Sequence, residues 1–225
     1  MPRTKRYLPE EGALHILARG NNKQKIFKDD IDYKTCLKRI FQYKEESNIL
    51  IYHYCLMPTH IHMIVEISNE STLSRFMKQL EVGYVHHYKR RYDYIGHFWQ
   101  DRYKSLLISN DSYLITCARY VELNPVRAEL VKNPEDYRYS SYKAYAYGYK
   151  NDIITYDPIY LELGNTNKKR QIAYRLDIEN ELHVKPINFN ARFFGSKRFV
   201  KDMENKFKVR NINTGRGRPK KSDKI

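Results

Sequence analysis

Residues 49–67 constrain the fold more strongly than any other stretch of this chain. Ile49–Leu56 and His60–Ile67 are apolar, strand-like runs joined by a short proline-containing connection, which predicts a β-hairpin. Residues two apart in a strand point to the same face of a sheet. One face of the second strand is therefore apolar, and the other face begins with His60 and His62. Both imidazoles would lie beside a turn, where a ligand can reach them.

The remaining patterns indicate an α+β chain. Strand-like runs at Leu14–Ala18 and Tyr103–Ile108 alternate with helical patterns, in the order strand, helix, strand, strand, helix, strand, helix. This is the split β-α-β order of ferredoxin-like and RNA-recognition folds. We expect an antiparallel sheet with helices packed on one face. The expected helices run from Asp29/Asp30 to about Ser47, from Glu70/Ser71 to Lys89–Arg91, and over Ser112–Leu123 after a cap at Asn110/Asp111. Their expected buried stripes are Ile31, Cys36, Leu37, Ile40, Phe41 and Tyr43 in the first helix, and Leu73, Phe76, Met77, Leu80 and Tyr84 in the second.

The charge indicates the kind of partner. A formal net charge of +15 over 225 residues favours a polyanion, with nucleic acid ahead of an anionic membrane surface. No apolar run is long enough to span a bilayer, and the start Met1-Pro2-Arg3 is not typical of a signal peptide. Three cysteines without metal-finger spacing indicate reduced thiols. We expect a cytoplasmic protein that does not contact membranes.

The composition changes after Pro134, where tyrosines crowd a segment with few aliphatic residues. We divide the chain into a first domain (1–150), a partly helical extension (151–210) and a basic tail (211–225) that we expect to be disordered when free. Arg216 and Arg218 of the tail can lie in an A·T-rich minor groove, which attracts arginine. A generic solvated basic tail explains the same residues.

Tyr120 and Asn124 are the residues that we expect to act with the histidine pair. Four apart on a helix, they point the same way. Two imidazoles and an amide oxygen can hold a divalent metal ion, and a phenol beside that ion can attack a phosphate. Each residue also has a plain structural reading. His-x-His occurs by chance in sheets, tyrosines pack in cores, and Asn124 before Pro125 can cap a new helix.

Arg102 and Lys104 lie two apart in the predicted fourth strand and would share a face, where they can contact phosphates. An edge strand protected by charge explains the same pattern.

Several motifs together give a resemblance. His60-Ile61-His62 resembles the His-hydrophobe-His motif of the single-tyrosine HUH transposases. The further segments resemble the REP-associated tyrosine transposases over about residues 7–147. These segments are Arg19-Gly20-Asn21, Gly96-His97-Phe98-Trp99-Gln100, Arg119–Ala128 and Tyr139-Ser140-Ser141-Tyr142.

This resemblance implies the HUH endonuclease fold and a transposase activity on single-stranded DNA with hairpin repeats. Tyr120 would be the nucleophile that forms a 5′-phosphotyrosine bond, and His60, His62 and Asn124 would hold a divalent metal, Mg or Mn. It also implies a prokaryotic, nucleoid-associated protein that is a monomer or a homodimer. The candidate DNA-binding residues are Arg19, Asn21, Trp99, Arg102, Lys104, Arg127, Arg216 and Arg218.

Two other functions fit the same sequence. A catalytically silent protein could bind hairpins or single strands through the same surface. A metal-dependent nuclease could hydrolyse DNA with water and form no covalent protein–DNA species.

Overall fold

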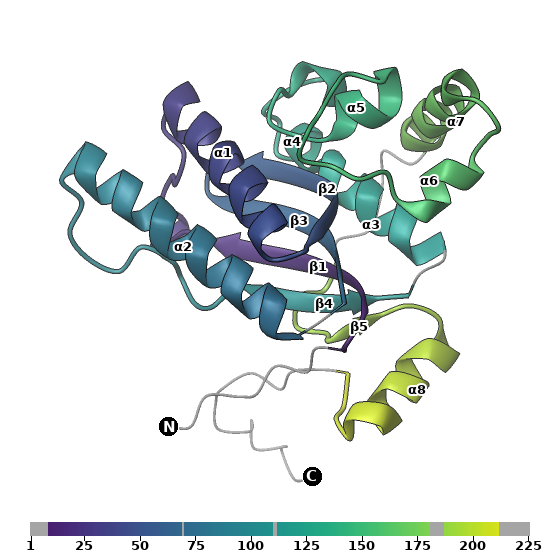
Figure 1. Ribbon diagram of the computed structural model, residues 1–225. Helices are drawn as coiled ribbons and strands as arrows, with labels where there is room; N and C mark the ends of the chain where they lie inside the picture. Colours follow the sequence, from purple (N-terminus) through teal and green to yellow (C-terminus); the bar gives the residue numbers. More distant parts are fainter. Residues whose placement is uncertain (1–8, 69, 110–111, 181–186, 212–225) are drawn as a thin grey trace, which may run out of the picture.

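The computed structural model describes residues 9–68, 70–109, 112–180 and 187–211 (Figure 1). Its centre is a five-stranded sheet in the order β2-β3-β1-β4-β5. The strands are β1 (Gly12–Arg19), β2 (Leu50–Met57), β3 (His60–Ile67), β4 (Lys104–Ile108) and β5 (Phe193–Phe194). The α+β, ferredoxin-like class predicted from the sequence is confirmed.

The predicted hairpin is present as β2 and β3, with Met57 paired to His60 across the turn. β1 pairs antiparallel with β3 over its whole length and with β4 on its other side. β5 pairs parallel with β4, so the sheet is mixed at this edge rather than wholly antiparallel. A two-residue strand joined to β4 by a long connection leaves no periodicity for a sequence to reveal.

Helices α1 (Asp30–Glu46) and α2 (Glu70–Tyr92) lie side by side across one face of the sheet (Figure 1). Asp29 caps α1 by accepting hydrogen bonds from the backbone N–H groups of Ile31 and Asp32. The stripe predicted for α2 is fully buried, as expected. In α1 the prediction is wrong for Ile31 and Phe41, which are 55% and 44% exposed.

Helix α3 (Ser112–Glu122) lies on the opposite face of the sheet, against β2 and β3 (Figure 1). The helices therefore do not all share one face, because the apolar stripe Leu114, Ala118 and Val121 packs on the side that carries the histidine pair. The short helix α4 (Asn124–Arg127) follows at once. Asn110 and Asp111, the predicted cap, lie outside the described residues.

The C-terminal part packs on the first part. A short 3-10 segment, η1 (Asn21–Lys23), follows β1, and a second, η2 (Pro134–Asp136), follows α4. The chain then forms α5 (Tyr142–Tyr147), α6 (Pro158–Glu162), α7 (Asn167–Asn180) and α8 (Lys197–Phe207). A second apolar cluster joins Leu123 to tyrosines of α5, α6 and α7. Its members come from both sides of residue 150, and the division there stays a prediction.

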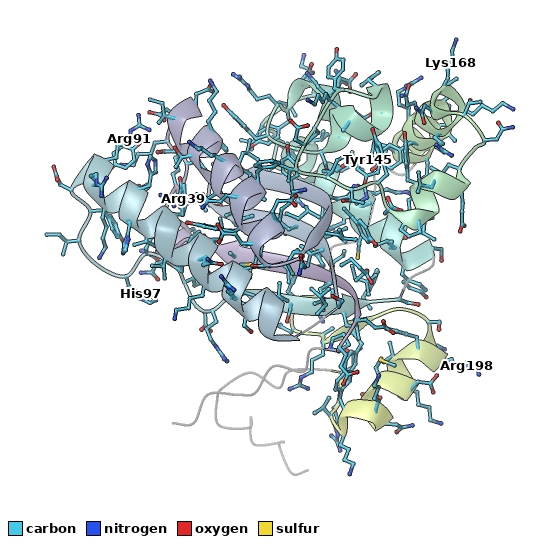
Figure 2. The ribbon with its side chains drawn as sticks, viewed as in Figure 1. Arg39, Arg91, His97, Tyr145, Lys168 and Arg198 are labelled. Atoms are coloured by element: carbon cyan, nitrogen blue, oxygen red, sulfur yellow. The ribbon has the colours of Figure 1, made fainter. Side chains whose placement is uncertain are left out.

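Basic side chains extend around the molecule, and Figure 2 shows Arg91, Lys168 and Arg198 at three separate ends of it, with Tyr145 in the interior. None of the helices in the described part of the chain is long and apolar enough to cross a membrane. The cysteines Cys36, Cys55 and Cys117 are buried and unpaired.

Candidate active site

The strand register brings the histidine pair and two candidate DNA-binding cations to one face of the sheet. Arg19 lies opposite His60 across the β1–β3 ladder, and Leu17 lies opposite His62. Lys104 lies opposite Leu17 across the β1–β4 ladder. Residues opposite each other in an antiparallel pair point to the same side. Arg19 and Lys104 therefore share the face of the imidazoles that α3 covers, on the neighbouring strands β1 and β4.

The two imidazoles of the pair are neighbours, with ring centroids 4.9 Å apart. Nδ1 of His60 lies 2.9 Å from Oγ1 of Thr59, and Nδ1 of His62 lies 2.9 Å from Nε2 of His15. These contacts leave Nε2 of each ring for a ligand. Burial lowers the pKa of His60 to about 4 and the pKa of His62 well below its ordinary value, with nearby Arg19 acting in the same direction. Both rings are therefore neutral at physiological pH, as metal ligands must be.

His15 is a site residue that the sequence reasoning missed. It lies in β1 on the same face, fully buried, and burial lowers its pKa to about 3. Its Nδ1 has no hydrogen-bond partner in the described structure. A polar residue inside the apolar run Leu14–Ala18 was a signal, but only the register with β3 places it beside His62.

Tyr120 projects from α3 toward these rings. Its ring centroid lies 5.8 Å from that of His62 and 5.8 Å from that of His15. Burial raises the pKa of the Tyr120 phenol, while the charges of Arg127 and Arg19 act in the opposite direction. The Arg127 guanidinium lies 4.1 Å from the centre of the Tyr120 ring and also donates to the Tyr120 carbonyl oxygen. The phenol thus lies between the histidines and a cation.

Asn124 begins α4, and Leu123 rather than Asn124 occupies the cap position. The Asn124 side-chain N–H group donates to the carbonyl oxygen of Tyr120 at 2.8 Å, which ties the amide to the helix carrying the phenol. An amide that donates through nitrogen keeps its oxygen for another partner. Within the described residues, no three histidine, cysteine or carboxylate groups gather at a metal-binding distance. Two neutral imidazoles and the oxygen of Asn124 therefore remain the predicted donor set for a divalent ion.

The other candidate DNA-binding residues lie in several different places. The half-buried Trp99 donates from its indole N–H to the carbonyl oxygen of Glu81 and packs edge-on against Phe98, so it supports α2. The backbone N–H group of Asn21 donates to the Phe98 carbonyl oxygen. Arg102 is exposed but precedes β4, so the expected co-facial pair with Lys104 on one strand is wrong. Arg216 and Arg218 lie outside the described residues.

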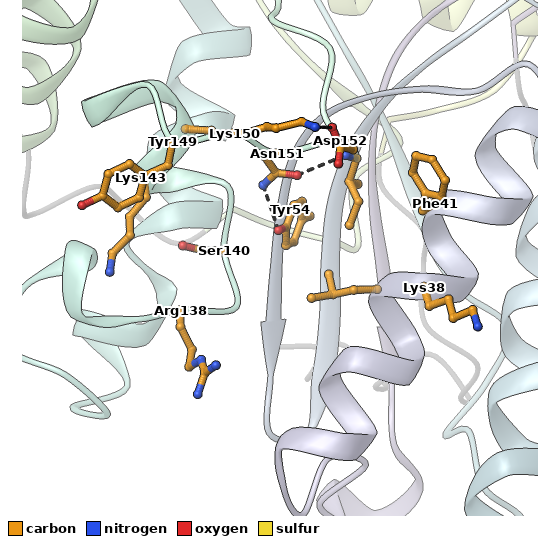
Figure 3. Close-up of a pocket in the computed structure, with 13 residues that line it drawn as sticks. Lys38, Phe41, Tyr54, Arg138, Ser140, Lys143, Tyr149, Lys150, Asn151 and Asp152 are labelled. Carbon is orange, nitrogen blue, oxygen red and sulfur yellow. Dashed lines mark hydrogen bonds and ion pairs between the residues drawn. The ribbon is translucent and has the colours of Figure 1, made fainter.

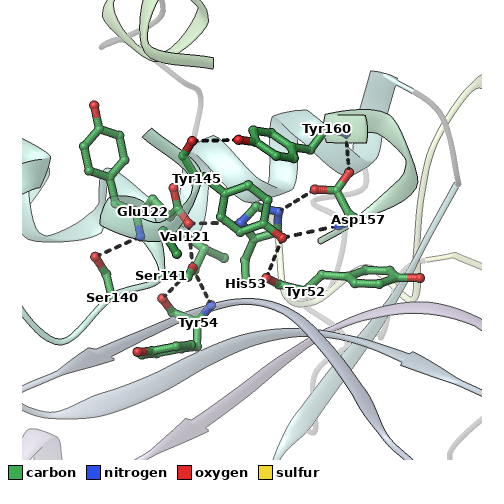
Figure 4. Close-up of polar contacts among 12 residues, drawn as sticks. Tyr52, His53, Tyr54, Val121, Glu122, Ser140, Ser141, Tyr145, Asp157 and Tyr160 are labelled. Atoms are coloured by element: carbon green, nitrogen blue, oxygen red, sulfur yellow. Dashed lines mark hydrogen bonds and ion pairs between the residues drawn. The ribbon is translucent and has the colours of Figure 1, made fainter. Parts of the chain in front are cut away.

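A buried polar network on the same face fixes α3 (Figure 4). Glu122 is fully buried and accepts hydrogen bonds from Ser141 at 2.5 Å and Tyr174 at 2.7 Å. Its carboxylate also lies 3.0 Å from Nδ1 of His53, whose Nε2 lies 3.1 Å from Asp157.

A second link lies one turn earlier in α3, where Arg119 donates to Asp177 of α7 at 2.6 Å. The helix that carries Tyr120 is thus held by the C-terminal part of the chain, through hydrogen bonds between residues up to 58 positions apart in the sequence. Sequence reasoning missed this network because no local spacing reports contacts of that range.

The sheet thus places a pair of histidines opposite a helix that carries a tyrosine. The family model "Transposase IS200 like" matches residues 10–124, more than half of the chain, and the protein belongs to that family. Transposases of this family cleave and rejoin DNA. The comparison with curated proteins found no match.

Among solved structures, the chain is similar to a REP-associated tyrosine transposase bound to a REP hairpin. The two are 20% identical with a TM-score of 0.54, over 70% of this chain and 93% of that one, which shows a shared fold. A proposed transposase from Deinococcus radiodurans is 13% identical with a TM-score of 0.38, over 60% of this chain and 97% of that one.

Proposed function

We propose that this transposase cleaves and rejoins single-stranded DNA beside a hairpin, with Tyr120 as the nucleophile. The observation that carries the proposal is the position of the Tyr120 ring, 5.8 Å between centroids from His62 and beneath the Arg127 guanidinium. A phosphate bound between these groups would meet a nucleophile on one side and neutral ligand nitrogens on the other.

The proposed reaction forms one bond and breaks one. The phenol oxygen of Tyr120 loses its proton and bonds to phosphorus, and the bond from phosphorus to the 3′ oxygen breaks. The DNA 5′ end is then linked to Tyr120, and the other end leaves as a 3′-hydroxyl after taking up a proton. A 3′-hydroxyl can later attack the phosphotyrosine and restore a phosphodiester, so strands are joined without ATP.

We propose that His60, His62 and Asn124 hold a divalent ion, Mg or Mn. Such an ion, when bound, would withdraw electron density from a non-bridging phosphate oxygen. The chain's own residues prepare the site, because Thr59 and His15 orient the two imidazoles and burial keeps them neutral. Arg127 and Arg19 favour the phenolate of Tyr120.

The proposed partner is single-stranded DNA that carries hairpin repeats, and the protein would act as a monomer or homodimer in the cytoplasm of a prokaryote, associated with the nucleoid. The solved relative in complex with a REP hairpin supports this partner. Arg19 of β1 and Lys104 of β4 share the face of the imidazoles and would contact phosphates there.

The test is a denaturing-gel assay with Mn²⁺ and labelled single strands copied from hairpin repeats beside the gene. A labelled band at protein size is expected, and Tyr120→Phe should abolish it while binding survives. Tyr113→Phe is the matched control, because Tyr113 lies two turns earlier on the same helix and should leave the adduct intact. Cleavage without an adduct would establish hydrolysis by water, and binding without cleavage in any metal would establish a silent binding protein.

A further inference from the structure

A cleft of about 490 Å³ lies on the opposite face of the sheet from Tyr120 (Figure 3). One wall is α1, with Lys38 and Phe41, and the other is the segment 138–153. Tyr54 of β2 lies in the floor. Because Tyr54 pairs with Met63, one residue beyond His62, it points away from the histidine face. The cleft is therefore separate from the candidate active site.

The side chains around this cleft combine cations with exposed aromatic rings. Arg138, Lys143 and Lys150 line it from the segment 138–153 and Lys38 lines it from α1, and Asp152 is the carboxylate among the lining residues. Phe41 is 44% exposed and Tyr149 is 61% exposed. Packing in the core does not explain the presence of rings that are this exposed. The amphipathic pattern of α1 does not explain Phe41 either, because Phe41 lies outside the buried stripe of that helix.

The polar contacts of the cleft leave its cations accessible. Lys150 pairs with Asp152 at 3.4 Å and Arg138 with Asp30 at 3.2 Å, in both cases between exposed side chains. Lys38 and Lys143 form no ion pair with any described residue, and Lys143 lies 5.9 Å from the centre of the Tyr149 ring. The Asn151 side chain is fixed between the Tyr54 hydroxyl, at 3.0 Å, and the N–H group of Ile153, at 3.1 Å. The floor is thus rigid, and the charged rim is free to bind an anion.

We propose that this cleft binds an unpaired nucleotide of the DNA, outside the segment that reacts at Tyr120. A cleft of this volume is suited to a ligand of nucleotide size. Lys143 and Arg138 would contact the phosphate, and Tyr149 or Phe41 would stack on the base. Unpaired bases expose their faces to aromatic side chains, whereas duplex bases expose only their edges. A DNA strand held here would pass around the β2 edge of the sheet. At that edge the N–H group of Leu56 donates to the carbonyl oxygen of Tyr139, and the N–H group of Ser141 donates to that of Tyr54.

The proposal rests on the chain being a DNA-processing transposase, but it does not depend on Tyr120 being the nucleophile. Its test therefore uses binding without metal. The full-length protein is titrated into a fluorescein-labelled octathymidylate, and anisotropy gives the dissociation constant. Tyr149→Ala should weaken binding by about tenfold, whereas Tyr149→Trp should keep the affinity because it keeps a stacking surface. Lys143→Ala should reduce the slope of log affinity against log salt by roughly 0.7. Lys168→Ala, an exposed lysine on α7, is the matched charge control, with a smaller change expected in each measurement.

Photocrosslinking locates the contact directly. Strands with 5-iododeoxyuridine at successive positions should crosslink to Tyr149 or Phe41 at a position outside the cleavage site. Unchanged affinity in Tyr149→Ala, equal weakening for a duplex of the same length, or crosslinks confined to the Tyr120 face would each overturn the proposal. If the unmodified protein forms no covalent adduct in the gel assay while these crosslinks remain, only the role of Tyr120 is overturned.

Discussion

Nε2 of His15 lies 2.9 Å from Nδ1 of His62, so a histidine of β1 supports the metal-binding candidate on β3. The two rings lie on one face because Leu17, two residues after His15, is the partner of His62 in the ladder. A ligand histidine whose other nitrogen is hydrogen-bonded is held in one orientation and tautomer. We assign His15 as a positioning residue for His62.

Replacement of His15 should weaken the metal site while leaving DNA binding intact. For His15→Gln, the Mn²⁺ concentration that gives half-maximal cleavage should rise by roughly tenfold to a hundredfold. The thermal stabilisation of the protein by Mn²⁺ should fall in parallel, which measures the metal without the reaction. His97→Gln changes an exposed histidine and is the control. An unchanged Mn²⁺ requirement in His15→Gln would show that His62 needs no such support.

The local part of this arrangement was predictable from the sequence, because the signals of a strand are local. The alternation in residues 60–67 predicted the bounds of β3 and the shared face of His60 and His62. The common direction of the Tyr120 and Asn124 side chains stays a prediction, because Asn124 begins α4 and its amide contacts the backbone of Tyr120. Trp99 shows the limit, because an aromatic residue among cations looks the same in a sequence whether it binds DNA or packs on α2.

The remaining features depend on contacts between distant parts of the chain. His15 acquires its role only through the β1–β3 register, and the buried group of Glu122, His53 and Asp157 joins three elements. Charged residues are ordinarily expected at the surface, and buried ones need polar partners. The sequence does not show which residues those partners are. The exposure of Phe41 follows from the cleft beside α1, which no helical periodicity predicts.

Arg127 should influence the rate of cleavage more than the affinity for DNA. The Arg127→Met variant removes the cation from the Tyr120 ring and the hydrogen bond to the Tyr120 carbonyl oxygen. The phenol then loses both a favourable charge and its position, and we expect single-turnover cleavage to slow by on the order of tenfold to a hundredfold. Lys132→Met, at an exposed cation nearby, should leave the rate unchanged. A loss of affinity with an unchanged rate at saturating protein would instead assign Arg127 to DNA binding alone.

The stability of the fold should fall between pH 6.5 and 9 because of His53. Burial opposes protonation of His53, but hydrogen bonds and charges of Asp157 and Glu122 outweigh it and raise its pKa from 6.5 to about 9. A raised pKa means that the stabilisation is present in full below pH 6.5 and is lost as the pH rises through 9. The pKa of Asp157 is lowered from 3.8, since its bonds to His53 outweigh burial, so its contribution is lost as the pH falls below that value.

Urea unfolding at a series of pH values tests this. The free energy of unfolding should fall by up to about 3 kcal/mol from pH 6.5 to pH 9, because one pKa unit corresponds to about 1.4 kcal/mol. The exposed-histidine variant His97→Gln should keep this profile. In His53→Gln the fold should be less stable at neutral pH, and this part of the profile should flatten. A flat profile in the unmodified protein would contradict a protonated His53.

The ion pair between Arg119 and Asp177 should stabilise the fold more than an exposed pair. The Arg119 side chain is 9% exposed, so Asp177→Asn leaves a largely buried cation with a weaker partner. We expect a loss of about 1–3 kcal/mol in the free energy of unfolding. Asp202→Asn breaks an exposed pair in α8 and should cost less than about 0.5 kcal/mol. Equal losses in the two variants would show that Arg119 does not secure α3 to α7.

The backbone at Gly20, which follows Arg19 at the rim of the site, leaves no room for a side chain. A Cβ atom at this position would lie 2.6 Å from Cγ2 of Ile26 and 2.8 Å from the backbone carbonyl oxygen of Gln24, so the chain itself would have to move. Gly20→Ala should therefore destabilise the fold by about 1–3 kcal/mol and weaken single-strand binding, because Arg19 would shift with the backbone. Gly83→Ala in α2 is the matched control: its nearest contact would be the end of the Arg39 side chain, which can rotate away, and alanine favours a helix. If Gly20→Ala unfolds at the same urea concentration as the unmodified protein, the close approach at Gly20 is not what positions Arg19.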